Sequence, residues 1–346
     1  MNLKFLKNKT ILITGGTGSI GSALVYRLIK TNCKAIRVMT NDENGLYEMS
    51  RDLNLSLLNY KKFYYGMGKK KIRFFLGDVR DFKRCIEVTK NVDIVIHAAA
   101  LKHVSIVEYN PSEAFQTNIN GTKNIARASI KNKVSKFLYI STDKVVTPKN
   151  IMGKTKLKAE NIIINFKNNI KKNSTKISSI RFGNILGSRG SVIPNFINLL
   201  QNKRNITVTD KRMARFVMTL DEAVNSVLKS ISLMKGQEIF ILKSMKCFKI
   251  YDLALALIEY FKIKNKKRNK IIISKKYVSE KFKEELYSED EMPFIKIKNN
   301  LFIITNKKLS QTSKINNMLK KYRVSNFNFM PKKKIIKLLI KAKILY

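Results

Sequence analysis

Residues Ser141 to Lys156, STDKVVTPKNIMGKTK, place an acid directly beside a base and a second base four positions after a methionine. Asp143 and Lys144 form the adjacent pair. Met152 and Lys156 would share one face of a helix, because residues four apart lie one turn apart. A carboxyl group beside an amine suits general acid and base chemistry. Met152 can neither donate nor accept a proton, and the alternative for Asp143 and Lys144 is an ion pair at a strand end.

A glycine-rich turn near the N-terminus is typical of dinucleotide binding. TILIT, residues 10–14, is a short β-branched run, and GGTGSIGSALVYRLIK follows it with apolar positions at helical spacing. Gly15 permits a tight bend, Gly18 lets the backbone approach a pyrophosphate, and Gly21 lets the helix pack closely on the strand. The helix N-terminus supplies amide donors for phosphates. An ordinary glycine-rich loop is disfavoured because the motif's strand and helix are both present.

Strand and helix patterns alternate through the rest of the first half, and they predict an α/β fold with a doubly wound parallel sheet. Further strands are expected in KAIRVMT, KIRFFLGDVRD, VDIVIHAAA and SKFLYIST, with a helix in PSEAFQTNINGTKNIARASIKN. The carboxyl ends of these strands should converge on one ligand crevice. They carry residues 40–43, Asp78, residues 98–102 and residues 141–144. The basic and aromatic segment from Ser56 to Lys70 interrupts the pattern and is expected to be a surface loop.

Composition limits the functional classes. The chain has 346 residues and a formal net charge of +45. The lysines are spread over almost the whole length, so we expect no nucleic-acid partner, since nucleic-acid binders concentrate their charge. Three cysteines without a C-x-x-C spacing and two histidines predict neither disulfides nor a metal site and fit the cytoplasm. No apolar run long enough for membrane insertion is present. The tail, Phe329 to Tyr346, is expected to be a helix docked on its own domain or on a second subunit, with contact to anionic lipid as the alternative.

Seven stretches between Thr14 and about Leu286 carry a family resemblance. They are TGGTGSIG, GDVRD, HAAALKHVSIVEYNPSEAFQTNINGT, STDKVVTPKNIMGKTK, RFGNILGSRGSVIP, DKRMARFVMTLDEAV and SEKFKEEL. The chain resembles the extended short-chain dehydrogenase/reductases, and within them the inverting UDP-N-acetylglucosamine 4,6-dehydratases of capsule and O-antigen synthesis. In the superfamily at large a tyrosine base stands at the position of Met152. Members of the capsule-type branch also carry methionine there, so the resemblance accounts for Met152 as a trait of that branch.

The resemblance implies a lyase that recycles its cofactor. A hydride would pass from sugar C4 to the nicotinamide, which acidifies the hydrogen at C5. Lys144 would take that proton, and Asp143 would protonate the departing C6 hydroxyl, which leaves as water. The hydride would then return to C6, and a proton would be delivered to C5 from the opposite face, which inverts that centre. Lys144 must therefore be neutral and Asp143 protonated. The acceptor of the C4 hydroxyl proton is left open between Asp143, Lys144 and water held by Thr142.

The remaining site residues also follow from the resemblance. The catalytic set is Asp143, Lys144, Lys156, Thr142 and Met152. The dinucleotide set is Gly15, Thr17, Gly18, Ser19, Ile20, Gly21, Thr40, Asn41, Asp78, Val79, Ala98, Lys102, Ser141 and Lys156. The UDP-N-acetylhexosamine set is Lys102, Asn184, Ser191, Val192, Pro194, Arg215 and Glu280, with Lys281 beside it. Asn41 stands where the family has an arginine for the 2′-phosphate, and this leaves the choice between NADP and NAD open. With Thr40 and the abundant lysines as compensation for the arginine, the sequence leans slightly to NADP.

The domain organisation and the competing functions complete these expectations. Residues 1–183 should form the NAD(P)-binding domain, with further elements from about 207–235, and residues 184–346 the smaller α/β substrate region. Association into a homo-oligomer is common in this family. A UDP-sugar 4-epimerase of the same fold would need no Asp143–Lys144 pair. A non-catalytic dinucleotide-binding regulator is the other alternative, and Met152 is the residue that favours it.

Overall fold

The computed structural model describes residues 3–56, 71–166, 175–265, 269–274, 280–309, 313–322 and 328–346. The chain forms two compact units. The first comprises Met1–Ser141, Thr155–Ile180 and Val224–Phe240, and the second comprises Thr142–Lys154, Arg181–Ala223 and Ile241–Tyr346. The sequence-based division at residue 183 stays a prediction. Of the segment Ser56 to Lys70, residues 57–70 lie outside the described part.

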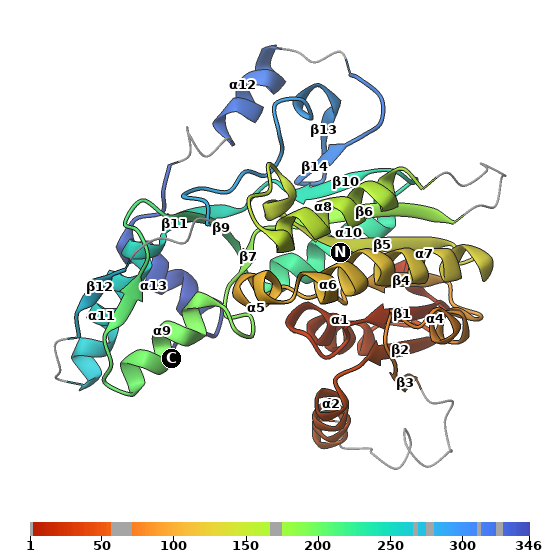
Figure 1. Ribbon diagram of the computed structural model, residues 1–346, viewed down its shortest axis with the longest axis horizontal. Coiled ribbons are helices and arrows are strands. Elements are labelled where there is room, and N and C mark those ends of the chain that lie inside the picture. The colour runs from red at the N-terminus through yellow and green to blue at the C-terminus, as the bar shows by residue number, and fades with distance from the viewer. Residues whose placement is uncertain are drawn as a thin grey trace. The chain divides into compact units, whose positions relative to one another are not determined.

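A mostly parallel sheet forms the centre of the first unit (Figure 1). Its strands are β1 Thr10–Thr14, β2 Ala35–Thr40, β3 Ile72–Leu76, β4 Ile94–His97, β5 Lys136–Thr142, β6 Lys176–Phe182 and β10 Ile239–Leu242. These seven strands follow one another in the order β10-β6-β5-β4-β1-β2-β3 within a nine-stranded sheet. Strand β1 pairs in parallel with β2 and β4, and Thr14 lies opposite Met39 and His97. All five residues of β1 are buried, as its continuous apolar run predicts for a strand covered on both faces.

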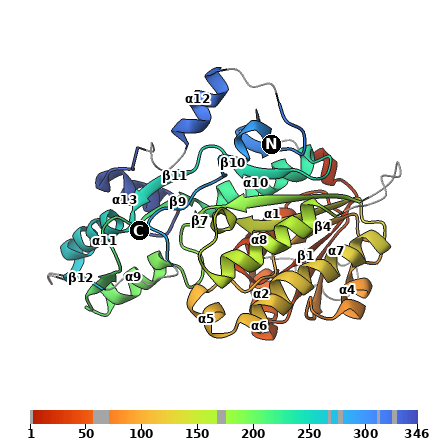
Figure 2. The same cartoon turned by 45° about the horizontal axis from the view of Figure 1, so that its top comes forward.

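Helices cover both faces of this sheet. Figure 2 shows α4, α7 and α8 in front of the sheet, and α1 and α10 behind it. The helices are α1 Ser19–Ile29, α2 Glu43–Ser56, α4 Phe82–Thr89, α5 Val104–Tyr109, α6 Pro111–Ala114, α7 Thr122–Lys131, α8 Ile151–Ile164 and α10 Leu220–Leu233. Leu12, Cys85, Ile125, Tyr139 and Ile163 belong to one buried cluster that joins α4, α7 and α8 to the sheet.

The expected strands and helices form, with two local differences. Strand β3 ends at Leu76 instead of reaching Asp78, because Gly77 and Asp78 begin the turn toward α4. The expected helix from Pro111 to Asn132 contains a π-helical segment, Phe115–Gly121, between α6 and α7. Such segments insert an extra residue into a helix, and they occur frequently at functional sites.

The second unit has its own sheets and core. It contains a three-stranded sheet of β11 Lys246–Lys249, β9 Ala214–Met218 and β7 Asn184–Ile185. Strand β8, Ile206–Val208, pairs with β12, Ile271–Ile273, and β13, Ile295–Lys298, forms a hairpin with β14, Leu301–Ile304. Its helices are α9 Val192–Gln201, α11 Ile250–Asn265, α12 Ser313–Lys321 and α13 Lys332–Lys341. Phe196, Val208, Phe248 and Leu257 lie in one buried cluster with residues of α13.

The C-terminal helix α13 packs within this second unit. Ile335 and Leu339 are fully buried in the cluster that also contains Leu253 and Leu257 of α11. Ile340, by contrast, is exposed. The apolar stripe of the tail is therefore used for packing inside the chain, as the first of the sequence-based alternatives expects. Within the described residues, every helix is too short or too polar to span a lipid bilayer.

The close packing at Gly21 gives a first prediction, Gly21→Ala. A Cβ at Gly21 would lie 2.3 Å from the carbonyl oxygen of Gly15, which belongs to the backbone and cannot swing away. We expect a loss of about 1–3 kcal/mol of unfolding free energy in urea titrations, despite the better helix propensity of alanine. Gly18→Ala is the control, because its Cβ would approach the same oxygen only to 3.3 Å. Equal effects of the two substitutions would contradict the role given to Gly21.

Candidate active site

The turn after β5 holds Asp143 and Lys144. The chain leaves the strand at Thr142 and forms a single 3-10 turn over Asp143–Val145. The Thr142 hydroxyl donates to Asp143 Oδ1 at 3.0 Å and accepts from the backbone N–H of Lys144 at 3.4 Å. These bonds fix both residues of the pair to the strand end. The predicted acid and base are therefore held on rigid backbone, as a catalytic pair requires.

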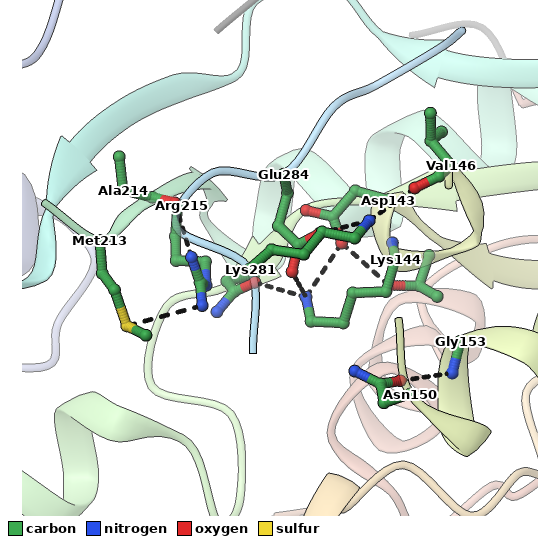
Figure 3. A network of polar contacts seen from close by, with 12 residues as sticks. Asp143, Lys144, Val146, Asn150, Gly153, Met213, Ala214, Arg215, Lys281 and Glu284 are labelled. Atoms are coloured by element: carbon green, nitrogen blue, oxygen red, sulfur yellow. Dashed lines mark hydrogen bonds and ion pairs between the residues drawn. The ribbon is translucent and has the colours of Figure 1, made fainter. Parts of the chain in front are cut away.

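The start of α8 lies directly against this turn. A Cβ at Gly153 would lie 2.7 Å from the carbonyl oxygen of Lys144. The Asn150 side chain accepts from the Gly153 N–H at 2.7 Å and so caps the helix (Figure 3). Gly153 thus allows the helix to begin against the backbone of Lys144, a role that the sequence analysis missed. An asparagine followed three residues later by a glycine was the available signal.

The Lys144 amine is surrounded by three oxygen acceptors. Its Nζ lies 3.0 Å from Asp143 Oδ1, 3.1 Å from Asn184 Oδ1 and 3.9 Å from Glu284 Oε1. The side chain of Lys144 is 20% exposed, whereas that of Asp143 is fully buried. The predicted pair is therefore present as a hydrogen-bonded ion pair, with the amine on its solvent side. Asn184, predicted to contact substrate, is within hydrogen-bonding distance of the amine.

Asp143 lies in surroundings that favour its protonated form. Burial raises the pKa of the Asp143 carboxyl, Lys144 pulls the pKa down, and the negative charge of Glu284 raises it again, with a net increase. Within the described part of the chain, the buried Asp143 Oδ2 has no hydrogen-bond partner. A protonated carboxyl can donate from that oxygen, whereas a carboxylate would leave a charged atom unpaired.

Glu284 is a buried residue of this site that the sequence analysis did not identify. Its Oε2 lies 3.2 Å from Lys281 Nζ, and Lys281 Nζ donates to the Val146 carbonyl at 2.5 Å (Figure 3). Burial alone would raise the pKa of Glu284, but Lys144, Arg215 and Lys281 together lower it. Glu284 is therefore an anion. The stretch SEKFKEEL contained it, but the adjacent Glu285 has the same residue type.

Lys156 lies buried in the first unit. Its Nζ donates to the Ile140 carbonyl at 2.6 Å and stands 4.3 Å from the centre of the Tyr139 ring. Burial lowers the pKa of Lys156 to about 7, with Glu160 acting in the opposite direction. Met152, one turn earlier on α8, is buried as well. Lys156 is thus able to be neutral near physiological pH.

The predicted dinucleotide loop bends sharply at Gly15 and leads into the N-terminus of α1. Gly15 has a φ of 64°, and a Cβ there would lie 2.7 Å from the Ala99 backbone nitrogen. Helix α1 begins at Ser19, and within the described chain no side chain caps it. The first turn of α1, which includes Ser19 and Ile20, is a helix N-terminus of the kind that binds anions. Thr17 lies beside this turn, with its Oγ1 3.2 Å from Thr40 Oγ1.

The adenine end of the predicted site contains two carboxylates. Asn41 donates to Asp78 Oδ2 at 3.4 Å, and Arg80 also binds the Asp78 carboxylate. Burial opposes ionisation of Asp78, but the bonds from Arg80 lower its pKa, so it is charged. Asp42 follows Asn41 and accepts from the Thr17 hydroxyl at 3.1 Å. Val79 is buried next to Asp78.

The loop after β4 is anchored by Asn118, another residue that the sequence analysis missed. This side chain lies in the π-helical segment, accepts from the Leu101 N–H at 2.8 Å and donates to the Leu101 carbonyl at 3.1 Å. It also donates to the Thr155 hydroxyl at 3.1 Å. Ala98 is half-buried and Lys102 is exposed in this loop. The irregular helix thus positions two predicted cofactor residues.

The other predicted substrate residues lie in the second unit. Ser191 precedes α9, and Val192 and Pro194 are in its first turn. Arg215 lies in β9 and donates to the carbonyls of Ala214 at 2.9 Å and Phe282 at 3.3 Å, and Glu280 is half-buried. Ser141 and Lys156 belong to the first unit, whereas Asp143 and Lys144 belong to the second. The predicted convergence of all site residues on one crevice joins residues of both units and stays a prediction.

Comparison with solved structures identifies the class of fold. The X-ray structure of Pen from Bacillus thuringiensis is 34% identical, has a TM-score of 0.86 and covers 97% of this chain and 98% of that chain. DesIV from Streptomyces venezuelae, a dTDP-glucose 4,6-dehydratase solved with NAD, is 16% identical, with a TM-score of 0.67 and coverage of 90% and 96%, a likeness of fold alone. The chain has the Rossmann fold of the extended short-chain dehydrogenase/reductases, which confirms the predicted fold class.

Comparison of sequences then identifies the family. Residues 11–306 match the family described as polysaccharide biosynthesis protein, and the chain belongs to this family. An uncharacterised membrane protein of Methanocaldococcus jannaschii is 43% identical over 303 residues, which are 87% of this chain and 86% of that protein. Capsular polysaccharide biosynthesis protein CapD of Staphylococcus aureus is 41% identical over 83% of this chain, which spans only 46% of CapD.

Relatives of similar identity carry two different enzyme names. A UDP-N-acetylglucosamine 4,6-dehydratase (inverting) of Campylobacter jejuni is 40% identical over 72% of this chain and 71% of its own length. A UDP-glucose 4-epimerase of Rickettsia canadensis is 39% identical over 82% of this chain and 79% of its own length. Overall identity therefore does not separate a dehydratase from an epimerase, and the distinction must come from the site.

The Lys156 environment gives a prediction about stability. Its folded-state pKa of about 7 lies below the ordinary value of 10.5, so between these pH values only the unfolded state binds the proton. The free energy of unfolding should therefore rise with pH, by up to about 1.4 kcal/mol per pH unit relative to Lys156→Met. Urea titrations at pH 7, 8 and 9 measure this difference. Lys154→Met, at an exposed position, should keep the wild-type slope, and a wild-type slope in Lys156→Met would contradict the assignment.

Proposed function

We propose that this protein is a nucleotide-sugar dehydratase that inverts C5 of UDP-N-acetylglucosamine and supplies a 4-keto-6-deoxy sugar for surface polysaccharide synthesis. Family membership supports the broader statement, a nucleotide-sugar dehydratase or epimerase of polysaccharide synthesis. The observation that carries the dehydratase proposal is the 3.0 Å bond between Lys144 Nζ and the buried Asp143 carboxyl. An elimination needs a base for the C5 proton and an acid for the leaving hydroxyl, and this pair offers both.

The hydrogen bond also explains how Lys144 can become neutral and Asp143 protonated, as the elimination requires. A neutral amine beside a protonated carboxyl holds the same number of protons as an ammonium beside a carboxylate. Moving one proton along the bond from Lys144 to Asp143 therefore converts the resting ion pair into a base and an acid. Burial, which raises the pKa of Asp143, favours this transfer. After the elimination, Lys144 holds the C5 proton and Asp143 is ionised, so the pair returns to its resting form.

The epimerase alternative makes less use of this site. Epimerisation at C4 moves a hydride and a hydroxyl proton and removes no proton from carbon C5. It would leave a buried, costly carboxyl beside Lys144 without a task. A Rickettsia relative is named UDP-glucose 4-epimerase, so epimerisation is the second candidate activity. The two activities differ in their products, so one experiment separates them.

The dinucleotide required for this chemistry would be held by residues of the first unit. When bound, its nicotinamide accepts the hydride from sugar C4 and later returns it to C6. The uncapped start of α1 and the bend at Gly15 fit the pyrophosphate. The uncharged Asn41 and its two carboxylate neighbours Asp42 and Asp78 do not offer a cation to a 2′-phosphate. These contacts favour NAD. The sequence analysis favoured NADP, and that preference stays a prediction.

The central prediction concerns deuterium incorporation. The protein, incubated with UDP-N-acetylglucosamine and catalytic amounts of NAD or NADP in heavy water, should form a 4-keto-6-deoxy sugar with deuterium at an inverted C5, detected by NMR. Lys144→Ala should lower the rate at least about 100-fold, because the base is lost. Lys149→Ala, an exposed lysine after the same turn, should retain the rate. Recovery of unlabelled substrate, or of its C4 epimer, would refute the dehydratase assignment.

A further prediction concerns the choice between NAD and NADP. Asn41→Arg should raise the affinity for NADP relative to NAD by roughly 10–100-fold, since a charge-assisted bond to phosphate is worth about 1.5–3 kcal/mol. Isothermal titration with each dinucleotide measures the ratio without any turnover. Asn41→Gln keeps an uncharged amide and is the matched control. An unchanged ratio in Asn41→Arg would show that Asn41 does not face the 2′ position.

A further inference from the structure

His97 is a buried titratable residue to which the proposed chemistry gives no task. It is the last residue of β4 and is fully buried. Its Nδ1 lies 2.6 Å from the Thr14 hydroxyl at the end of β1, and its Nε2 lies 2.9 Å from the Thr122 hydroxyl at the start of α7. One imidazole ring therefore links the strand that precedes the glycine-rich loop to a helix.

The hydrogen bonds of the neighbouring groups determine where the proton of this ring lies. The Thr122 hydroxyl donates to the Asn118 carbonyl at 2.6 Å, so it must accept from His97. The proton is therefore on Nε2, and Nδ1 accepts from the Thr14 hydroxyl. The Thr14 oxygen in turn accepts from the Ala99 N–H at 3.4 Å. All donors thus point the same way along the chain of bonds from Ala99 to Asn118, and neutral His97 is its middle link.

This chain of bonds joins the two supports of the loop that follows β4. Thr14 holds the start of the loop through the Ala99 N–H. The Asn118 side chain holds its far end through two hydrogen bonds with Leu101. The same loop lies against the glycine-rich turn, because a Cβ at Gly15 would approach the Ala99 backbone nitrogen to 2.7 Å. The imidazole ring is therefore the connection between two loops that are predicted to bind the dinucleotide.

The surroundings keep the ring neutral, as the direction of the bonds requires. Burial lowers the pKa of His97 to about 3, and the charge of Lys156 acts in the same direction. The Tyr139 ring packs against the imidazole with the ring centres 5.7 Å apart, and the Lys156 amine stands 4.3 Å from the centre of the same Tyr139 ring. An imidazolium would carry a proton on both nitrogens and would lose the bond that Thr14 donates. The network therefore has one arrangement at physiological pH.

We propose that His97 is a positioning residue that holds the glycine-rich loop and the loop after β4 in the relative placement that binds the dinucleotide. This role rests on the dinucleotide site of the proposed function, but not on the reaction that follows. A ring without exposed surface touches neither the dinucleotide nor the sugar. It acts through Thr14 and Thr122, and what it contributes is a directed pair of hydrogen bonds, which an apolar side chain cannot supply.

Dinucleotide affinity tests this role without turnover. His97→Leu removes both bonds of the ring, and Thr122→Val removes the bond on the Nε2 side. In isothermal titration with NAD and with NADP, each variant should bind the dinucleotide that the wild type prefers roughly 10-fold more weakly, since a buried polar group loses its partner.

Thr89→Val is the matched control for Thr122→Val. Thr89 is also fully buried, donates to the carbonyl four residues earlier, that of Cys85, at 2.7 Å, and accepts from the Asn132 side chain at 2.7 Å. It lies at the end of α4, shortly before β4 begins. Thr89→Val should therefore lower the urea midpoint of unfolding about as much as Thr122→Val does, yet keep the wild-type affinity for the dinucleotide.

Nitrogen-15 NMR of histidine-labelled protein is the second readout. The chain has two histidines, so His103→Asn assigns the signals of His97. At about pH 6, where an ordinary histidine is largely protonated, His97 should be neutral with its proton on Nε2. A proton on Nδ1, or a charged ring, would contradict the directed network.

The outcomes separate this inference from the proposed function. Wild-type affinity in Thr122→Val, or an equal loss of affinity in Thr89→Val, would overturn the role of His97, and this comparison decides it even if His97→Leu does not fold. If the wild type binds a dinucleotide and the variants weaken it as expected, but no keto sugar forms, the proposed function fails and the role of His97 stands. Binding of neither dinucleotide by the wild type would refute both.

Discussion

The burial of four charges in one small cluster is the constraint on which the second unit depends. Asp143, Lys144, Lys281 and Glu284 are each expensive to remove from water, and only their mutual contacts offset that cost. They come from two segments almost 140 residues apart in sequence, the turn after β5 and the stretch that follows residue 280. The folding of the intervening chain, with β7 supplying Asn184 and β9 supplying Arg215, is what brings the compensating groups together.

The excess of basic residues in this chain makes the surroundings of Asp143 unusual. In a chain with 69 basic and 24 acidic residues, a carboxyl group readily finds a cation. Asp78, Glu284 and Glu291 accordingly have lowered pKa values, because lysine or arginine neighbours outweigh burial, and the exposed Glu259 has one through its bond with Lys332. Among the described carboxyl groups with a shifted pKa, Asp143 alone is raised. A raised carboxyl pKa is thus the exception among these residues, and it occurs beside the candidate base.

The sequence predicts the parts of the structure that depend on local pattern. The strands and the glycine turn follow from short apolar runs and from Gly15 and Gly21, because these signals lie within a few residues of one another. The choice between Glu284 and Glu285 does not follow, since burial of one neighbour and not the other is decided by contacts with Lys281 and Lys144. The π-helical segment that places Asn118 beside Leu101 does not follow from the sequence either, because its residues have ordinary helical periodicity.

The methionine at position 152 fits the electrostatics of the residue one turn later. A lysine that serves a tyrosine base must stay charged to hold the phenolate, so it needs an anionic or well-solvated environment. Lys156 is instead buried, with its Nζ against the Ile140 carbonyl and the face of Tyr139, and burial lowers its pKa to about 7 against the opposing charge of Glu160. A buried apolar side chain at 152 leaves no phenolate for that lysine to stabilise. In the proposed reaction the proton of the C4 hydroxyl then requires another acceptor. The elimination needs Lys144 neutral for the C5 proton and Asp143 protonated for the leaving hydroxyl, so in this scheme a water molecule held by Thr142 is left for the C4 hydroxyl proton.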